Sequence, residues 1–161
     1  MPVTPNSSVF HNVPVMRQPQ TWACWYTSFQ MVVAYERGRA RGQGLKDPSE
    51  VAWIKAIFDG NKGIGATYDE REKVAKALGF QVLFASLSAD GIWDILQNVP
   101  MIYAGRWPGV GFGHFVVLVG ISESRLVINN PATGMETYDY NWFAGQMLLQ
   151  TEERPLIYPP Y

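Results

Sequence analysis

The chain has one cysteine, Cys24, at the start of a run of apolar residues with helical spacing. Thr21 is suited to cap this predicted helix, which would place Cys24 in the first turn. The free N–H groups and the positive end of the helix dipole stabilise a thiolate there, and the thiolate is the nucleophilic form of cysteine. Free cysteine is also among the most often buried residue types, so Cys24 by itself is either a nucleophile or a small core residue.

A thiol nucleophile needs a base, and the chain has two histidines. His114 follows three glycines in GVGFGH and opens the apolar run HFVVLVGI, so we expect it at the rim of a buried strand. His11 lies in a proline-rich segment, and we expect it to be solvated. His114 is therefore the predicted partner, able to form an ion pair with Cys24, unless it is an ordinary core or surface histidine.

An amide could orient the imidazole of His114. A hairpin that turns near Ser124 would return as RLVINNP and lay Asn130 roughly opposite His114, where its side chain could fix the imidazole tautomer. Asn129 is the rival for this role, and asparagine before Pro131 is also ordinary turn chemistry. The spacing therefore predicts an orienting asparagine and leaves two candidates for it.

A glutamine upstream of Cys24 could stabilise negative charge that develops on a carbonyl oxygen. Acyl transfer places an oxyanion near the nucleophile, where a fixed side-chain amide and a backbone N–H group stabilise it. Gln18 lies six residues before Cys24, outside the predicted helix, and Gln20, four residues before it, is the competitor. Without the other site residues, either glutamine would be an ordinary surface side chain.

The elements that would position these residues change in character along the chain. Residues 1–20 contain four prolines and are expected to form an extended arm. Helices are predicted over about 21–35, 51–60, 69–80 and 89–98, and short strands over about 81–87, 101–107, 114–121, 125–130 and 135–143. Helices followed by an antiparallel sheet define an α+β fold, here expected as one domain of residues 1–161.

The composition excludes several classes of function. A net charge of −1 gives no electrostatic basis for binding nucleic acid or an anionic membrane. No apolar run is long enough to span a bilayer, and the first residues lack the pattern of a signal peptide. One cysteine cannot form an internal disulfide, and with only two histidines we expect no metal site and no cofactor.

The order of the candidate residues resembles the motif order of the papain-like cysteine peptidases: Gln18, Cys24–Trp25, Gly113–His114 and Asn130–Pro131. The pattern is most similar to two compact bacterial branches, the C70-type papain-like peptidases and the C39-like peptidases of bacteriocin processing. This resemblance implies a papain-like fold, with the nucleophile on the first helix and the N-terminal helices packed on a C-terminal antiparallel sheet. The chain departs from the large papain and cathepsin enzymes by lacking a second cysteine, and from most C39-like relatives by Asn130 in place of Asp.

The resemblance implies a cysteine endopeptidase that works by acyl transfer. In that mechanism Cys24 attacks a peptide carbonyl, Gln18 and the Cys24 N–H group stabilise the oxyanion, His114 transfers protons and Asn130 orients its ring. Similar small bacterial modules are often toxin or effector domains. A secretion or contact-dependent system delivers them to the cytoplasm of a target cell, and a cognate immunity protein blocks them in the producer. The expected partners are therefore a protein substrate and an immunity protein, with no nucleic acid and no membrane.

The resemblance also indicates a cleavage site with small residues. C39-like relatives cleave after a double glycine in a narrow aromatic cleft, so we expect a preference for glycine-like residues. The aromatic residues that could line such a cleft, unless they belong to the core, are Trp22, Trp25, Trp107, Phe112 and Trp142. The alternatives are a thiol amidase, deamidase or transglutaminase-like toxin on the same scaffold, and a non-catalytic binding module. The chain retains all four site residues, which argues against the last of these.

Overall fold

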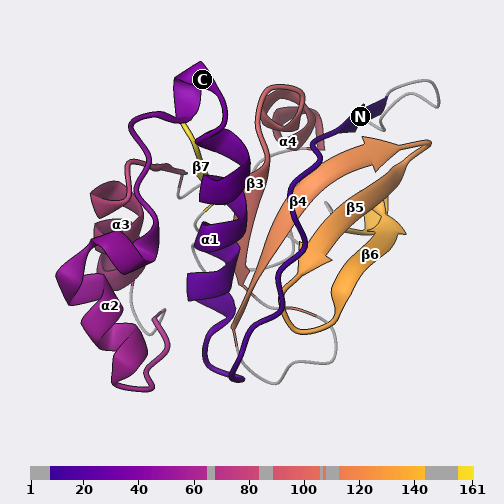
Figure 1. Cartoon of the computed structure of the whole chain (residues 1–161). Coiled ribbons are helices and arrows are strands. Elements are labelled where there is room, and N and C mark those ends of the chain that lie inside the picture. The colour runs from indigo at the N-terminus through magenta and orange to yellow at the C-terminus, as the bar shows by residue number, and fades with distance from the viewer. Residues whose placement is uncertain (1–7, 65–67, 84–88, 106, 108–112, 144–155) are drawn as a thin grey trace.

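The computed structural model describes residues 8–64, 68–83, 89–105, 107, 113–143 and 156–161. Its helices are α1 (Cys24–Glu36), α2 (Ala52–Asp59), α3 (Tyr68–Ala77) and α4 (Ala89–Leu96). Its strands are β1 (Ser8–Phe10), β2 (Gln81–Leu83), β3 (Met101–Gly105), β4 (His114–Ser122), β5 (Arg125–Asn130), β6 (Gly134–Asp139) and β7 (Leu156–Tyr158). Helices come first and most of the sheet follows, which confirms the predicted α+β class (Figure 1).

The strands form one antiparallel sheet in the order β2-β7-β3-β4-β5-β6. β3 pairs with the first half of β4, and β1 pairs with its last three residues, 120–122. Glu123 and Ser124 form the tight turn from β4 to β5, and both have positive φ, as the central residues of a type I′ hairpin turn require. β4 therefore lies at the centre of the sheet, and β5 and β6 extend from it as a meander.

Alternating side chains divide the sheet into two buried faces. Phe115, Val117 and Val119 of β4 pack in the core shared with α1, whereas Val116 and Leu118 pack in a second core shared with α4. This alternation follows from the two-residue period of a strand. Because both faces of the central strand are covered, its sequence is an almost continuous apolar run.

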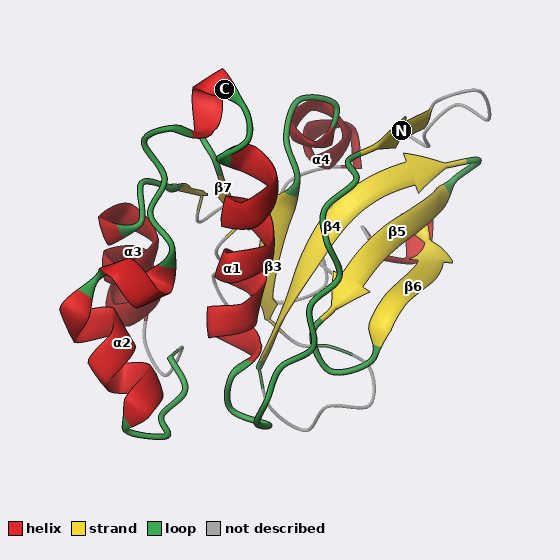
Figure 2. Cartoon of the chain, in the orientation of Figure 1, coloured by secondary structure: helices red, strands yellow, loops and turns green. Residues whose placement is uncertain are grey.

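Helix α1 is the central helix of the molecule. It lies between the sheet and the helical pair α2 and α3 (Figure 2). Ten of its thirteen residues are buried, so it is apolar on most of its circumference, as expected for a helix covered on several sides. This packing holds the start of α1, and with it Cys24, in a fixed place.

The described part of the N-terminal arm runs along the sheet in extended form (Figure 1). After β1, the His11 N–H group donates to the Val119 carbonyl at 2.8 Å. At the other end of the arm, the Gln18 N–H group donates to the Pro131 carbonyl at 2.8 Å. These bonds lay the arm across β4 and β5 before the chain enters α1.

His11 is buried, so the expectation that it is solvated was wrong. Its side chain is only 6% exposed. Its Nε2 lies 2.6 Å from the Leu96 carbonyl at the end of α4, and its Nδ1 lies 3.2 Å from the Tyr35 hydroxyl of α1. His11 therefore joins the arm to two helices.

None of the described helices is both long and apolar enough to span a bilayer.

Candidate active site

The candidate residues gather where α1 begins, β4 begins and β5 ends. These three points lie at the same edge of the sheet, the lower one in the view of Figure 2. The Cys24 thiol accepts a hydrogen bond from the backbone N–H group of Phe115, the residue next to His114. Gln18 is bonded through its own N–H group to Pro131, the residue after Asn130. The fold thus brings together two segments that lie far apart in the sequence.

Cys24 is the first residue of α1, and the helix has no side-chain cap. Ala23, not Thr21, occupies the N-cap position, because Ala23 N–H bonds to the Gln20 carbonyl and closes a turn just before the helix. The free N–H groups of this first turn are therefore available to the sulfur. Burial raises the pKa of the Cys24 thiol, and hydrogen bonds from the backbone of Phe115, Trp25 and Cys24 itself oppose this shift.

The side chains of His114 and Asn130 are hydrogen-bonded. His114 Nε2 lies 2.8 Å from Asn130 Oδ1, and the Ala132 N–H group donates to the same oxygen at 3.0 Å. Because a backbone N–H group can only donate, the Asn130 atom that it meets must be the amide oxygen. His114 Nε2 therefore carries the hydrogen and donates it, which leaves Nδ1 with a lone pair that can accept a proton.

Burial lowers the pKa of His114 below its usual value, although the hydrogen bond to Asn130 and the charge of Glu136 oppose the shift. The imidazole is only 3% exposed. His114 is therefore held neutral at neutral pH, which is the form that can act as a base.

The two adjacent asparagines have different contacts. Asn129 points to the other face of β5, where its Nδ2 donates to the Val13 carbonyl of the arm at 3.1 Å. Asn130 points to the His114 side. Of the two candidates, Asn130 is the one hydrogen-bonded to the imidazole within the described part of the chain, and Asn129 instead anchors the arm.

Gln18 lies beside the site through its backbone, and its side chain is held locally. Its Nε2 donates to the Gln20 carbonyl at 2.9 Å, which leaves a second N–H bond on the same nitrogen. Its Oε1 is buried without a hydrogen-bond partner among the described residues. Gln20, the competitor, is exposed.

Two charged residues near the site were not found from the sequence. Arg71 of α3 acts electrostatically on Cys24, lowering its pKa, and its guanidinium lies 6.0 Å from the centre of the Phe115 ring. Glu136 of β6 accepts a hydrogen bond from the Asn130 side chain. Within the described part of the chain, no three His, Cys, Asp or Glu side chains cluster as metal ligands would.

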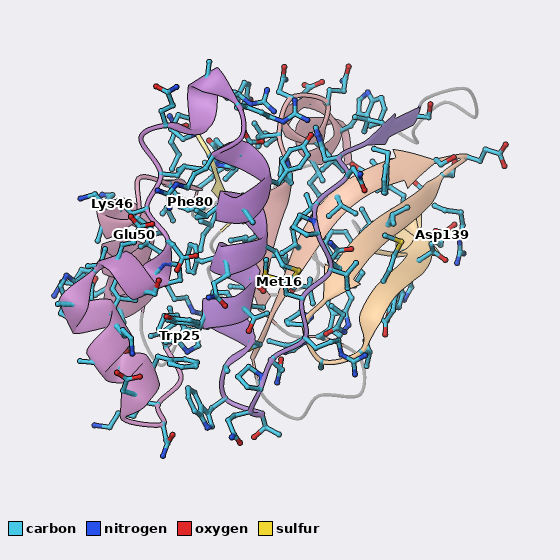
Figure 3. All side chains as sticks on the ribbon, viewed as in Figure 1. Met16, Trp25, Lys46, Glu50, Phe80 and Asp139 are labelled. Carbon is cyan, nitrogen blue, oxygen red and sulfur yellow. The ribbon has the colours of Figure 1, made fainter. Side chains whose placement is uncertain are left out.

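The aromatic residues expected near a cleft have different environments. Trp25 has no exposed surface, and its Nε1 donates to the Lys62 carbonyl. Figure 3 shows it pointing from α1 towards α2. Trp107 is buried as well, at 5% exposed. Both are core residues in this structure, because large apolar rings next to a motif fill the space behind it.

Two other tryptophans have exposed surface. Trp22 is half-buried, with its ring 5.1 Å from that of Phe58. Trp142 is 38% exposed and stacks on Tyr138 with ring centres 5.6 Å apart. For these two residues a role in lining the cleft stays a prediction. Phe112 lies outside the described residues.

Solved structures of peptidases have the same fold. A double glycine motif protease from an AMS/PCAT transporter in complex with the leader peptide has a TM-score of 0.54 at 20% identity, over 99% of this chain and 98% of that one. The peptidase domain of Streptococcus ComA has a TM-score of 0.60 at 18% identity, over 93% and 100%. A C39-like peptidase from Bacillus anthracis has a TM-score of 0.60 at 15% identity, over 97% and 99%. No curated protein matches this chain in sequence.

The fold is therefore that of the papain-like peptidases, as the motif order predicted. Residues 7–147 match the family model described as papain-like cysteine protease AvrRpt2, peptidase family C70. The match covers most of the chain, so the chain belongs to this family and is a papain-like cysteine protease, a hydrolase.

Proposed function

We propose that this protease is an endopeptidase in which Cys24 is the nucleophile, His114 the base and Asn130 the orienting residue. The observation that carries the proposal is the bond from His114 Nε2 to Asn130 Oδ1, because it leaves Nδ1 as the proton acceptor. The hydrogen bond from the Phe115 N–H group to the Cys24 sulfur supports it, since Phe115 follows His114 directly and the thiol therefore lies near the start of β4. Gln18 supplies an amide donor next to the same point.

In the proposed reaction His114 Nδ1 takes the proton of the Cys24 thiol, and the sulfur attacks the peptide carbonyl carbon. Negative charge on the carbonyl oxygen is stabilised by the Gln18 amide and the Cys24 N–H group. His114 gives its proton to the leaving amine, which releases the first product. His114 then takes a proton from water as the water oxygen attacks the thioester carbon. The C–S bond breaks, the carboxylic acid product leaves, and His114 returns the proton to the Cys24 sulfur.

The proposed substrate is a protein with small residues at the cleavage site, and the proposed setting is a toxin or effector domain. Such a domain would be delivered by a secretion or contact-dependent system, would act in the cytoplasm of a target cell, and would be held inactive in the producer by an immunity protein. The likeness to a protease in complex with a leader peptide supports a peptide substrate. The single cysteine supports activity in a reducing compartment, since folding needs no disulfide.

Expression in bacterial cytosol tests this function. Wild-type protein should arrest growth and produce shortened host proteins, whereas Cys24→Ala should do neither while folding normally by circular dichroism. New N-termini identified by mass spectrometry would give the cleavage site, and glycine should precede it. Equal toxicity of the wild-type and Cys24→Ala proteins would overturn the hypothesis that Cys24 is the nucleophile. Release of wall peptides, ammonia or crosslinked proteins without cleavage would instead favour the amidase, deamidase or transglutaminase-like alternatives.

A further inference from the structure

Glu136 closes a chain of side-chain hydrogen bonds that begins at His114. The Asn130 oxygen meets two donors, His114 Nε2 and the Ala132 N–H group, so its Nδ2 is the group that donates to the Glu136 carboxylate. A flipped Asn130 amide would turn its oxygen towards the carboxylate and its NH2 group towards the Ala132 N–H. Both ends of the amide therefore select the orientation that accepts from His114.

The carboxylate of Glu136 is itself held in place. The Tyr138 hydroxyl donates to Oε2 at 2.7 Å, and the Thr133 hydroxyl donates to Oε1. Burial raises the pKa of Glu136, but hydrogen bonds from Thr133, Tyr138 and Asn130 outweigh it and leave the pKa below its usual value. Glu136 is therefore ionised at neutral pH.

The register of the strands explains this arrangement. Glu136 lies opposite Ile128, so Asn130 is its diagonal neighbour on the same face of the sheet. Tyr138 is two residues further along β6 and has the same orientation. The strand pairing thus places the three side chains in a row.

We propose that Glu136 is a positioning residue for the protease, which fixes the amide of Asn130 and supplies negative charge that stabilises the His114 imidazolium. This inference rests on the proposed function, because the imidazolium forms when His114 takes the proton of Cys24. Asn130 is neutral, so it can orient the imidazole without stabilising its positive charge as a carboxylate would. Glu136, which lies behind Asn130, supplies a negative charge instead, and this charge acts to raise the pKa of His114.

Two cations lie on the elements around this row. Arg17 of the arm donates to the carbonyls of Ala132 (2.8 Å) and Thr133 (3.3 Å) in the β5–β6 turn. Arg71 of α3 lies on the Cys24 side. Glu136 is the charged group that acts on His114 with a sign favouring the imidazolium.

The test is a titration of the histidine rings by NMR in wild type, Glu136→Gln and Asp139→Asn. Asp139 is the matched control, because it is an exposed acid at the far end of the same strand (Figure 3). The chain has two histidines, so His11 serves as an internal reference. In Glu136→Gln the His114 midpoint should move to lower pH while His11 stays in place, and Asp139→Asn should move neither. A His114 midpoint that is the same in Glu136→Gln and wild type overturns the proposal.

A stability cycle tests the same contact between Asn130 and Glu136 without a histidine titration. Asn130→Asp should lower the melting temperature at pH 7, because it would set a second carboxylate against Glu136, and adding Glu136→Gln should restore part of the loss. Equal melting temperatures of Asn130→Asp with Glu or Gln at position 136 overturn the proposal. Neither readout needs catalysis, so failure of the proposed function, seen with Cys24→Ala, is separate from failure of this inference.

If Cys24 is the nucleophile and Glu136 stabilises the His114 imidazolium, the Glu136→Gln variant should also react more slowly with iodoacetamide. Glu136→Gln should lower the alkylation rate of Cys24 at pH 7 by roughly tenfold, the scale on which outer partners of functional histidines act in metal sites. Glu136→Asp, which keeps the charge, should recover part of this rate. Equal rates in the Gln and Asp variants would mean that Glu136 acts only by filling space, which overturns the electrostatic role.

Discussion

The backbone of Gln18 is bonded to the backbone of Pro131, with 2.8 Å between the amide nitrogen and the carbonyl oxygen. This bond joins the segment that leads into α1 to the turn that follows Asn130. The donor of the proposed oxyanion site and the orienting residue of the base are therefore held relative to each other by main chain rather than by long side chains. Substitution of the Gln18 side chain should leave this bond intact.

Gln18→Ala should consequently reduce catalysis without reducing stability. Removal of one oxyanion donor costs about 100- to 1000-fold in kcat in other acyl-transfer enzymes. We expect a loss of this order for a peptide that spans the cleavage site found in the expression experiment. Gln20→Ala is the control and should retain activity. Similar losses in both variants would remove the distinction between the two glutamines.

Asn129→Ala and Asn130→Ala should have different effects. Asn129→Ala breaks a buried bond to the arm and should lower the free energy of unfolding by about 1–3 kcal/mol. Its Cys24 should still react with iodoacetamide at the wild-type rate. Asn130→Ala should slow that reaction by roughly 10- to 100-fold, because the imidazole loses the partner that fixes its tautomer. An unchanged rate in Asn130→Ala would contradict its orienting role.

Arg71→Gln should make Cys24 less reactive. The guanidinium lowers the pKa of the thiol, so its removal raises that pKa and leaves less thiolate at neutral pH. Alkylation by iodoacetamide at pH 7 should become roughly two- to fivefold slower, and the rate profile should move to higher pH. The alkylation rate of Arg71→Lys should lie between those of wild type and Arg71→Gln. Arg39, which stacks on Tyr35, is the control arginine, and Arg39→Gln should behave as wild type.

Stability should fall as the pH drops below about 6.5. Burial lowers the pKa of both His11 and His114 below the ordinary histidine pKa of about 6.5, so the unfolded chain takes up protons before the native protein does. The stabilisation is therefore complete above pH 6.5 and is lost as the pH falls towards the native pKa values. His11→Gln should be about 1–2 kcal/mol less stable at pH 7 but less sensitive between pH 7 and pH 5. Thermal unfolding across this pH range is the measurement. If the stability of His11→Gln falls with pH as steeply as that of wild type, the lowered pKa of His11 does not contribute to the pH dependence.

Arg41→Met should destabilise the protein strongly. Glu36 has no exposed surface, and Arg41 donates to both of its carboxylate oxygens, at 2.8 and 3.1 Å. Removal of the guanidinium leaves a buried charge without compensation, which costs about 3 kcal/mol or more. Lys55→Met, which breaks the exposed pair with Asp59, should leave the urea midpoint unchanged. Equal midpoints for wild type and Arg41→Met would show that Glu36 is satisfied in another way.

The sequence was informative where contacts are local. The hairpin that brings Asn130 to His114 follows from two apolar runs and a short turn, so the pairing could be predicted from the sequence. The bounds of β5 agree with the prediction, and those of β4 differ by one residue. The choice between Asn129 and Asn130 depends on which face of β5 each presents, and this required the observed register.

Contacts between distant segments could not be predicted. The burial of His11 depends on α1 and α4 meeting the arm, and no spacing in the sequence reports that meeting. Strands β1 and β7 have three residues each, too few to show a two-residue period. Glu136 had a detectable signal, since a β5–β6 hairpin makes it a diagonal neighbour of Asn130, but only once the register is known.

The division of the site between two distant segments has a consequence during synthesis of the chain. Cys24 leaves the ribosome early, whereas His114, Asn130 and Glu136 are all added within residues 114–136. A nascent chain that ends before this meander carries a thiol without a base. We expect the thiol of such a chain to react like that of a free cysteine, so that activity begins only when the last strands pair and α1 docks against them.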